Sequence, residues 1–259
     1  MQDLNTFSSL NKKEKDTKTV NIIKGLIMDT VRHANSGHTG GPMSSSDFTY
    51  ILYKEFLNFD PNNPNWFNRD RFILSAGHES ALQYVLLTMI GWLELDDLKQ
   101  FRQLHSKTPG HPEIEIDGVE CTTGPLGQGF GMSTGMALAE SFLSNTLKSI
   151  DEEASSLVDH FTYVIASDGD MQEPITLGSA SLSGHLGLSK LIVFYDSNEV
   201  QISGGVSRSD STDYGVVFKG FGWHVQKIDG HDHDSIRIAI RKAQKSNQPS
   251  LIIGETIMA

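Results

Sequence analysis

Apolar residues recur along the chain in a pattern typical of amphipathic helices. In residues 17–34, four aliphatic side chains fall on one face at helical spacing: Val20, Ile23, Ile27 and Val31. Similar patterns predict helices over residues 46–57, 79–92 and 125–149. The last of these ends in the acidic stretch DEEASS, which is typical of a solvated loop.

Shorter apolar runs between the helical patterns predict strands. The runs at 161–166, 190–195 and 250–257 are expected to be buried, and further strands are expected at 69–75 and 223–228. The alternation of the two patterns predicts an α/β fold with an open, mainly parallel sheet and helices on both faces. Residues 16–259 are expected to form one domain, preceded by a polar tail, residues 1–15, that is frayed or disordered.

Oxygen-bearing side chains follow two of the predicted strands. Asp168 comes just after the run VIA, while Asp196 and Asn198 follow LIVFY. Loops after the carboxyl ends of parallel strands form the ligand crevice, so Asp168 and Asn198 are expected to meet. With a nearby backbone carbonyl they would bind a hard cation such as Mg²⁺, together with phosphate and water. A lone DG is commonly a turn and a lone Asp a helix cap, but the paired strands favour the metal site.

Three histidines lie in glycine-flanked loops. His38, His78 and His111 stand in SGHTGGP, SAGHES and TPGHPE respectively. A lone histidine is more often structural or exposed than catalytic. Glycine before each one permits a tight turn and close approach to a ligand, so the imidazoles are expected to point into a common crevice. Neutral imidazole donates and accepts hydrogen bonds, which suits a polyol with adjacent hydroxyls.

A glycine-rich loop, CTTGPLGQGFG, begins at Cys121 and is by itself a weak signal. Its place among the other motifs is more informative. In chain order, SGHTGGP, SAGHESALQY, TPGHPE, TTGPLGQG, SDGDMQE and YDSNEV resemble the N-terminal, diphosphate-binding domain of transketolases. The resemblance runs from about Lys18 to the last residue. Its most specific part is the pair TPGHPE and TTGPLGQG, which more distant thiamine-diphosphate enzymes generally lack.

The resemblance implies a role for each matching residue. The metal motif implies Asp168, Asn198 and the backbone carbonyl of Val200 as ligands of Mg²⁺ or Ca²⁺. His38 and His111 are implied to hold hydroxyls of the donor sugar, and a histidine of this set takes the proton released as the sugar is cleaved. The residues implied to lie against thiamine diphosphate are His78, Gly124, Pro125, Leu126, Gly169, Glu173 and Asn198. Glu173 also resembles a glutamate at the subunit interface that couples two active sites.

Three positions depart from the family pattern. Ser167 and Pro174 stand where the family has glycine, and Asp170 stands where a small or apolar residue is common. Pro174 suits the first turn of a helix, where no backbone N–H is needed. Asp170 is expected either to face solvent or to alter metal affinity. None of the three departures removes a ligand.

The resemblance also implies an activity and partners. Transketolases transfer a two-carbon ketol unit from a ketose phosphate to an aldose phosphate, in the cytoplasmic pentose phosphate pathway. This chain is expected to need a pyrimidine-binding domain or C-terminal subunit, in a homodimer or heterotetramer, and to be inactive alone. Two alternatives remain: another ketol transferase, such as a dihydroxyacetone synthase or deoxyxylulose-phosphate synthase, or a non-catalytic diphosphate-binding subunit. The end at LIIGETIMA fits either a split subunit or a fragment of a longer enzyme.

Composition restricts the partners further. The net charge of −11 argues against nucleic acid as a main partner. The sequence contains no run of about 18 apolar residues, so no membrane span is expected, and the N-terminus lacks an apolar signal core. The single cysteine, Cys121, excludes an intrachain disulfide, fits a reducing cytosol and is expected to be a packing residue.

A second histidine pair superficially resembles a metal cluster. His231 and His233 lie in DGHDHDS, after the predicted strand 223–228. Aspartate and serine at such a position are typical of a strand exit followed by a helix cap. We therefore expect a structural turn here.

Overall fold

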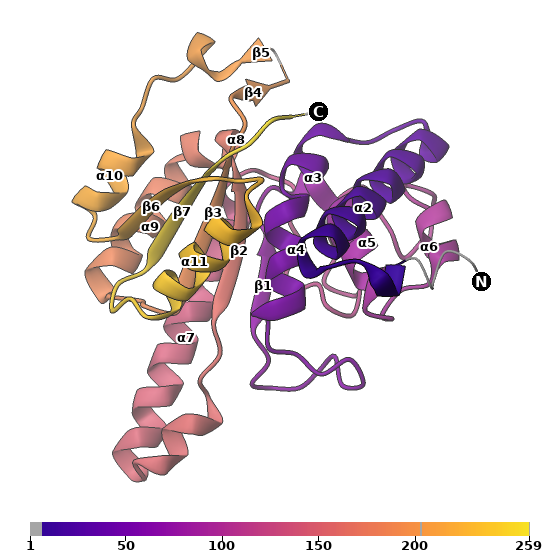
Figure 1. The fold of residues 1–259 in the computed structure, drawn as a ribbon. Helices are drawn as coiled ribbons and strands as arrows, with labels where there is room; N and C mark the ends of the chain where they lie inside the picture. The colour runs from indigo at the N-terminus through magenta and orange to yellow at the C-terminus, as the bar shows by residue number, and fades with distance from the viewer. Residues whose placement is uncertain (1–6, 203, 259) are drawn as a thin grey trace.

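The computed structural model describes residues 7–202 and 204–258, which contain a five-stranded parallel sheet (Figure 1). The strand order is β1-β2-β3-β7-β6, and each neighbouring pair is parallel. The strands are β1 (Arg71–Leu74), β2 (Thr162–Ser167), β3 (Leu191–Ser197), β6 (His224–Asp229) and β7 (Ser250–Glu255). A small antiparallel hairpin pairs β4 (Val200–Gln201) with β5 (Gly204–Gly205). The predicted α/β class with a parallel sheet is confirmed.

Helices cover both faces of the sheet. One face packs against α2 (Lys12–Ala34), α4 (Ser46–Glu55), α5 (Ser80–Met89) and α11 (His233–Gln244). The other packs against α7 (Gln128–Ile150), α9 (Pro174–Leu186) and α10 (Tyr214–Gly220). The shorter helical elements are α3 (Gly40–Ser44), η1 (Gly77–Glu79), α6 (Leu95–Lys99), η2 (Glu153–Leu157), α8 (Asp168–Gln172) and η3 (Val206–Arg208).

The two hydrophobic cores follow from the alternation of side chains along each strand. On β2, Tyr163 and Ile165 enter the core beneath α2, α4, α5 and α11, whereas Val164 and Ala166 enter the core beneath α7, α9 and α10. All six residues of β2 are buried. A strand covered on both faces needs apolar side chains at every position, which explains the continuous apolar runs in the sequence.

Helix boundaries differ from the sequence prediction where local turns intervene. Helix α2 begins at Lys12, five residues before the predicted start, because Asn11 and Glu14 form a capping box. Residues 12–15 are therefore helical, and residues 1–6 of the predicted tail lie outside the described residues. Helix α7 begins at Gln128 instead of 125, because Gly127 has a left-handed φ of 79° and turns the chain.

Parallel pairing aligns the carboxyl ends of the strands at one edge of the sheet. Ser167 of β2 lies opposite Asp196 of β3, and Asp196 lies opposite Gly254 of β7. The loops that carry Asp168 and Asn198 therefore leave the sheet side by side. This is the arrangement in which α/β proteins bind ligands.

Candidate active site

A cavity of about 710 Å³ lies at the carboxyl edge of the sheet. Its walls come from the loop before α3 and from segments that follow β1, β2, β3 and β7. Its lining residues are Gly37, His38, Thr39, Gly40, Gly41, His78, His111, Gly124, Leu126, Ser167, Asp168, Gly169, Gln172, Glu173, Asn198, Val200, Gln201, Ile202 and Met258. Every candidate site residue from the sequence except Pro125 is among them. Pro125 is exposed, because the turn between Gly124 and Gly127, both with positive φ, carries Leu126 inward instead.

The three histidines meet in this cavity. The rings of His38 and His78 lie edge to face with their centroids 5.1 Å apart. Burial, followed by the neighbouring His38, lowers the pKa of His78 to about 4. Burial, followed by the positive charge of Arg102, also lowers the pKa values of His38 and His111. All three imidazoles are therefore neutral near pH 7, so each can donate one hydrogen bond and accept another.

Two glycines allow the histidine loops to approach each other. A Cβ on Gly77, before His78, would lie 2.7 Å from the backbone nitrogen of Gly124. Gly124 has a φ of 149°, which side-chain-bearing residues rarely adopt, and its own Cβ would lie 3.3 Å from Cγ of His111. The glycine-rich loop thus lies directly between the loops of His78 and His111. Larger residues at either position would push these loops apart.

Asp168 and Asn198 are both buried at the floor of the cavity. The Asp168 carboxylate accepts hydrogen bonds from the Tyr195 hydroxyl at 2.5 Å and from the backbone N–H of Glu199 at 3.0 Å. The Asn198 amide donates to Asp196 at 2.7 Å, and its oxygen accepts the Val200 N–H at 3.1 Å. These bonds fix the orientation of both groups.

The donor set around Asp168 suits a hard cation. Burial raises the pKa of Asp168 to about 6, against the opposing hydrogen bond from Tyr195. A bound cation would offset the cost of ionising this buried carboxyl. A carboxylate, an amide oxygen and a backbone carbonyl are oxygen ligands of the kind that Mg²⁺ and Ca²⁺ accept. Among the described residues there is no group of three or more His, Cys, Asp or Glu side chains that could hold a metal ion, and the predicted set contains only one such side chain.

Asp170 joins three of the loops around the cavity. It is fully buried, so it does not face solvent, the first of the two alternatives considered from the sequence. One carboxylate oxygen accepts the Ser75 hydroxyl at 2.6 Å and the Gly127 N–H at 2.7 Å. The other accepts the backbone N–H of Ser167 at 2.9 Å and its hydroxyl at 2.8 Å. This residue therefore ties the loop after β1, the glycine-rich loop and the loop after β2 to one another.

Asp196 forms a second buried junction, one for which the sequence supplied no specific role. Its carboxylate accepts the Ser44 hydroxyl at 2.6 Å, the Asn198 amide at 2.7 Å and the Thr256 hydroxyl at 2.5 Å. It thus connects α3, the loop after β3 and the segment after β7. The apolar run before YDSN indicated that Asp196 lies at the end of a strand. Its bonds to Ser44 and Thr256 could not be predicted, because these residues lie 152 and 60 positions away in the chain.

Comparisons with known proteins agree with this geometry. The family model described as transketolase, thiamine diphosphate binding domain, matches residues 15–259. The transketolase of Staphylococcus epidermidis is 49% identical over 247 residues, which cover 95% of this chain and 37% of that protein. The transketolase of Staphylococcus aureus strain MW2 is 49% identical over 241 residues, 92% of this chain and 36% of that protein.

Solved structures show the same fold. The crystal structure of transketolase from Campylobacter jejuni matches with a TM-score of 0.89 and 42% identity, over 95% of this chain and 38% of that one. Transketolase from Leishmania mexicana matches with a TM-score of 0.90 and 41% identity, over 93% and 36% respectively. The chain spans about 37% of the length of its curated relatives. On the family match and these identities, the chain belongs to the transketolase family, in the part that forms its thiamine diphosphate binding domain.

Proposed function

We propose that this chain is the N-terminal part of a transketolase. Such an enzyme transfers a two-carbon ketol unit from a ketose phosphate to an aldose phosphate with thiamine diphosphate and a divalent cation. The observation that carries the proposal is one cavity that contains three neutral histidines and the buried pair Asp168 and Asn198. Residues 16–259 would then act as one diphosphate-binding domain.

The cavity contains groups that could bind both the metal ion and the diphosphate of the cofactor. Asp168, Asn198 and the Val200 carbonyl would hold Mg²⁺, or Ca²⁺, together with diphosphate oxygens. Gly169 lets the Leu126 side chain approach its backbone, because a Cβ there would lie 2.7 Å from Cδ1 of Leu126, and both residues line the cavity in which the cofactor would bind. His78 and Gly124, which line the same cavity, would also lie against the cofactor. When bound, thiamine diphosphate supplies a nucleophilic carbon and an electron sink for cleavage beside a ketone.

The histidines would act on the sugar. His38 and His111 remain partly accessible from the cavity, and their lowered pKa values keep a lone pair free on each ring. Each can therefore accept one sugar hydroxyl and donate to another, or receive the proton released as the carbon–carbon bond breaks. A well-positioned acid or base typically contributes about 10²–10⁴ in rate.

The exposed surface favours a larger assembly. The outer faces of α7 and α9 expose large apolar side chains: Met132, Leu138, Phe142, Leu143, Ile175, Leu182 and Leu186. Apolar patches of more than a few hundred Å² generally mark interfaces. We assign this surface to a pyrimidine-binding domain or C-terminal subunit, within a homodimer or heterotetramer. Glu173, at the start of α9 and on the cavity wall, would link the site to that interface.

The cellular setting follows from the same proposal. No helix in the described part of the chain has both the length and the apolar character needed to cross a membrane. We assign the protein to the cytoplasm and to the pentose phosphate pathway, with sugar phosphates as substrates. The single cysteine, Cys121, is buried, and burial raises its pKa to about 11, which supports a packing role.

Calorimetry tests the metal assignment. In Asp168→Ala, thiamine diphosphate binding in the presence of Mg²⁺ should fall by at least about 100-fold, because the only charged ligand is lost. Asp213→Ala, an exposed helix cap outside the cavity, is the control. Cofactor affinity in Asp168→Ala equal to that of the control would reject the metal site.

Reconstitution with a pyrimidine-binding partner tests the activity. The chain alone should turn over no ketose phosphate, and the complex should transfer the ketol unit. In that complex, His38→Ala and His111→Ala should depress kcat/KM for the sugar by about 10²-fold or more while cofactor affinity changes little. Wild-type kcat/KM in both variants would contradict the histidine assignment, and full activity of the isolated chain would contradict the need for a partner.

A further inference from the structure

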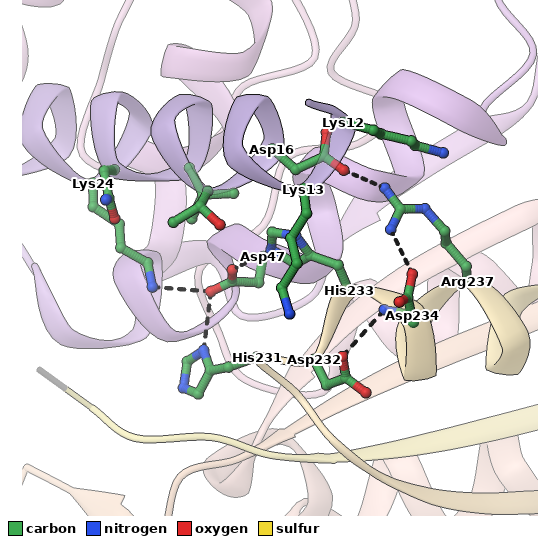
Figure 2. A pocket seen from close by; sticks show the side chains of 13 residues that line it. Lys12, Lys13, Asp16, Lys24, Asp47, His231, Asp232, His233, Asp234 and Arg237 are labelled. Carbon is green, nitrogen blue, oxygen red and sulfur yellow. Dashed lines mark hydrogen bonds and ion pairs between the residues drawn. The ribbon is translucent and has the colours of Figure 1, made fainter. Parts of the chain in front are cut away.

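A second cavity, of about 450 Å³, lies between α2, α4 and the start of α11 (Figure 2). Charged residues line it, and oppositely charged ones pair across it. Lys24 of α2 contacts Asp47 of α4, and Arg237 of α11 contacts Asp16 of α2; Arg237 also contacts Asp234, one turn away on its own helix. Since these charges already satisfy one another, the cluster joins three helices and does not point to an ionic ligand.

Asp47 is the centre of this cluster. One carboxylate oxygen lies 2.7 Å from Nε2 of His233, and the other lies 2.9 Å from both Nδ1 of His231 and Nζ of Lys24. Burial opposes ionisation of Asp47, but hydrogen bonds from His231, His233 and Lys24 outweigh burial and hold its pKa well below the usual range. Asp47 is therefore a carboxylate that only accepts hydrogen bonds, so Nδ1 of His231 must donate to it.

The other ring nitrogen of His231 holds a different part of the chain. Nε2 accepts the backbone N–H of Ile257 at 2.9 Å. A ring that donates from Nδ1 and accepts at Nε2 has one defined tautomer. The predicted helix cap is present as well, because Asp232 caps α11. Nothing in the DGHDHDS pattern indicated that the preceding histidine, His231, bridges two distant segments.

Ile257 belongs to the segment that leaves β7 along the active-site cavity. Thr256, before it, bonds Asp196 through its hydroxyl and the Ser197 carbonyl through its N–H. Met258, after it, lies on Gly40, where a Cβ would be 2.4 Å from the Met258 sulfur. Met258 lines the same cavity as His38. The backbone path at Ile257 therefore determines where Met258 lies in the wall of the active-site cavity.

We propose that His231 is a positioning residue for the sugar-binding side of the active site. It lies outside the active-site cavity and acts through the acceptor that Nε2 offers to the Ile257 N–H; the bond from Nδ1 to Asp47 sets the tautomer that leaves Nε2 free to accept. This fixes Met258 against Gly40, beside the loop that carries His38. The sugar-binding part of the inference rests on the proposed function, whereas the bridge itself does not.

Two variants separate the two halves of the bridge. His231→Asn places an amide N–H near the position of Nδ1 and keeps a donor to Asp47, but provides no acceptor for Ile257. His231→Gln extends further and places a carbonyl oxygen near the position of Nε2. In the complete enzyme, amide hydrogen exchange at Ile257 should accelerate about tenfold in His231→Asn and remain near the wild-type rate in His231→Gln. Ile252, in the middle of β7, is the control and should exchange slowly in both.

Kinetics test the consequence for the sugar. His231→Asn should raise KM for the ketose phosphate about tenfold and leave the dissociation constant of thiamine diphosphate unchanged, and His231→Gln should restore KM. Unchanged Ile257 exchange in His231→Asn would overturn the bridge. A parallel loss of cofactor affinity, or no rescue by glutamine, would overturn the positioning role. If His231→Asn unfolds, rapid exchange at Ile252 will reveal it; His231→Phe, which keeps a ring but offers Ile257 no acceptor, then replaces it, and an unchanged KM in that variant would overturn the positioning role. Absence of any ketol transfer by the wild-type enzyme would refute the proposed function, while the exchange result would still decide the bridge.

Discussion

Replacement of Asp170 by asparagine removes one acceptor from a fully buried site. The asparagine oxygen can still accept from Ser75 and Gly127, but its NH₂ group then faces the backbone N–H of Ser167, which cannot turn away. A buried donor left without an acceptor costs about 1–3 kcal/mol, and the remaining bonds weaken because they lose their charge assistance. We therefore expect the free energy of unfolding to fall by about 2–4 kcal/mol.

Urea unfolding monitored by circular dichroism measures this change, with the midpoint compared at constant m-value. Asp213→Asn is the matched control, because Asp213 is an exposed cap that bonds the Val216 N–H at 3.0 Å, and asparagine caps helices about as well as aspartate. The control should change stability by under about 0.5 kcal/mol. An Asp170→Asn midpoint equal to that of the control would refute the idea that Asp170 holds three loops together.

Two further predictions concern packing and acid stability. Gly184→Ala should lower the free energy of unfolding by about 3 kcal/mol or more, because its Cβ would lie 1.8 Å from the Phe221 carbonyl oxygen. Gly178→Ala is the control, because Gly178 lies in the same helix with nothing within 4 Å of its Cβ position, and it should be neutral or stabilising. Similar urea midpoints for the two variants would contradict this prediction. Burial, followed by Arg71, lowers the pKa of His160 from 6.5 to about 4. The unfolded chain therefore binds a proton that the folded chain does not, so stability should fall as pH drops from 6.5 towards 4, by up to about 1.4 kcal/mol per pH unit from this residue. His160→Gln should flatten that slope, and an unchanged slope would count against the buried neutral histidine.

Most of the sheet could be predicted because β1, β2, β3 and β7 are largely buried, whereas the edge strand β6 has no buried residue. Continuous apolar runs then coincide with strands, and the polar residues that end each run mark the carboxyl edge. The same edge effect brings Asp168 and Asn198 together, and the glycines before His38, His78 and His111 correctly indicated loops that converge on one cavity. These features are local in the sequence.

The supporting contacts could not be predicted, because they join residues that are distant in the chain. Asp170 meets Ser75 across 95 positions, and Asp47 meets His231 and His233 across 184 and 186 positions. Such contacts depend on strand order, and periodicity does not encode strand order. Because Asp170 lies two residues after Asp168, a proposed metal ligand, the sequence suggested that it faces solvent or affects a metal, although its actual partners are donors from three loops.

The position of β7 also affects when the domain can form during synthesis. β7 lies between β3 and β6 in the sheet, although it follows both of them, and the other described strands, in chain order. Until residue 255 has left the ribosome, β6 has no partner in this sheet and β3 is an open edge. Synthesis at about 5–20 residues per second thus leaves β6 unpaired for seconds, with an exposed strand edge that invites intermolecular pairing. Because Thr256 and Ile257 follow β7 directly, the cavity wall that they hold is assembled only once β7 has entered the sheet.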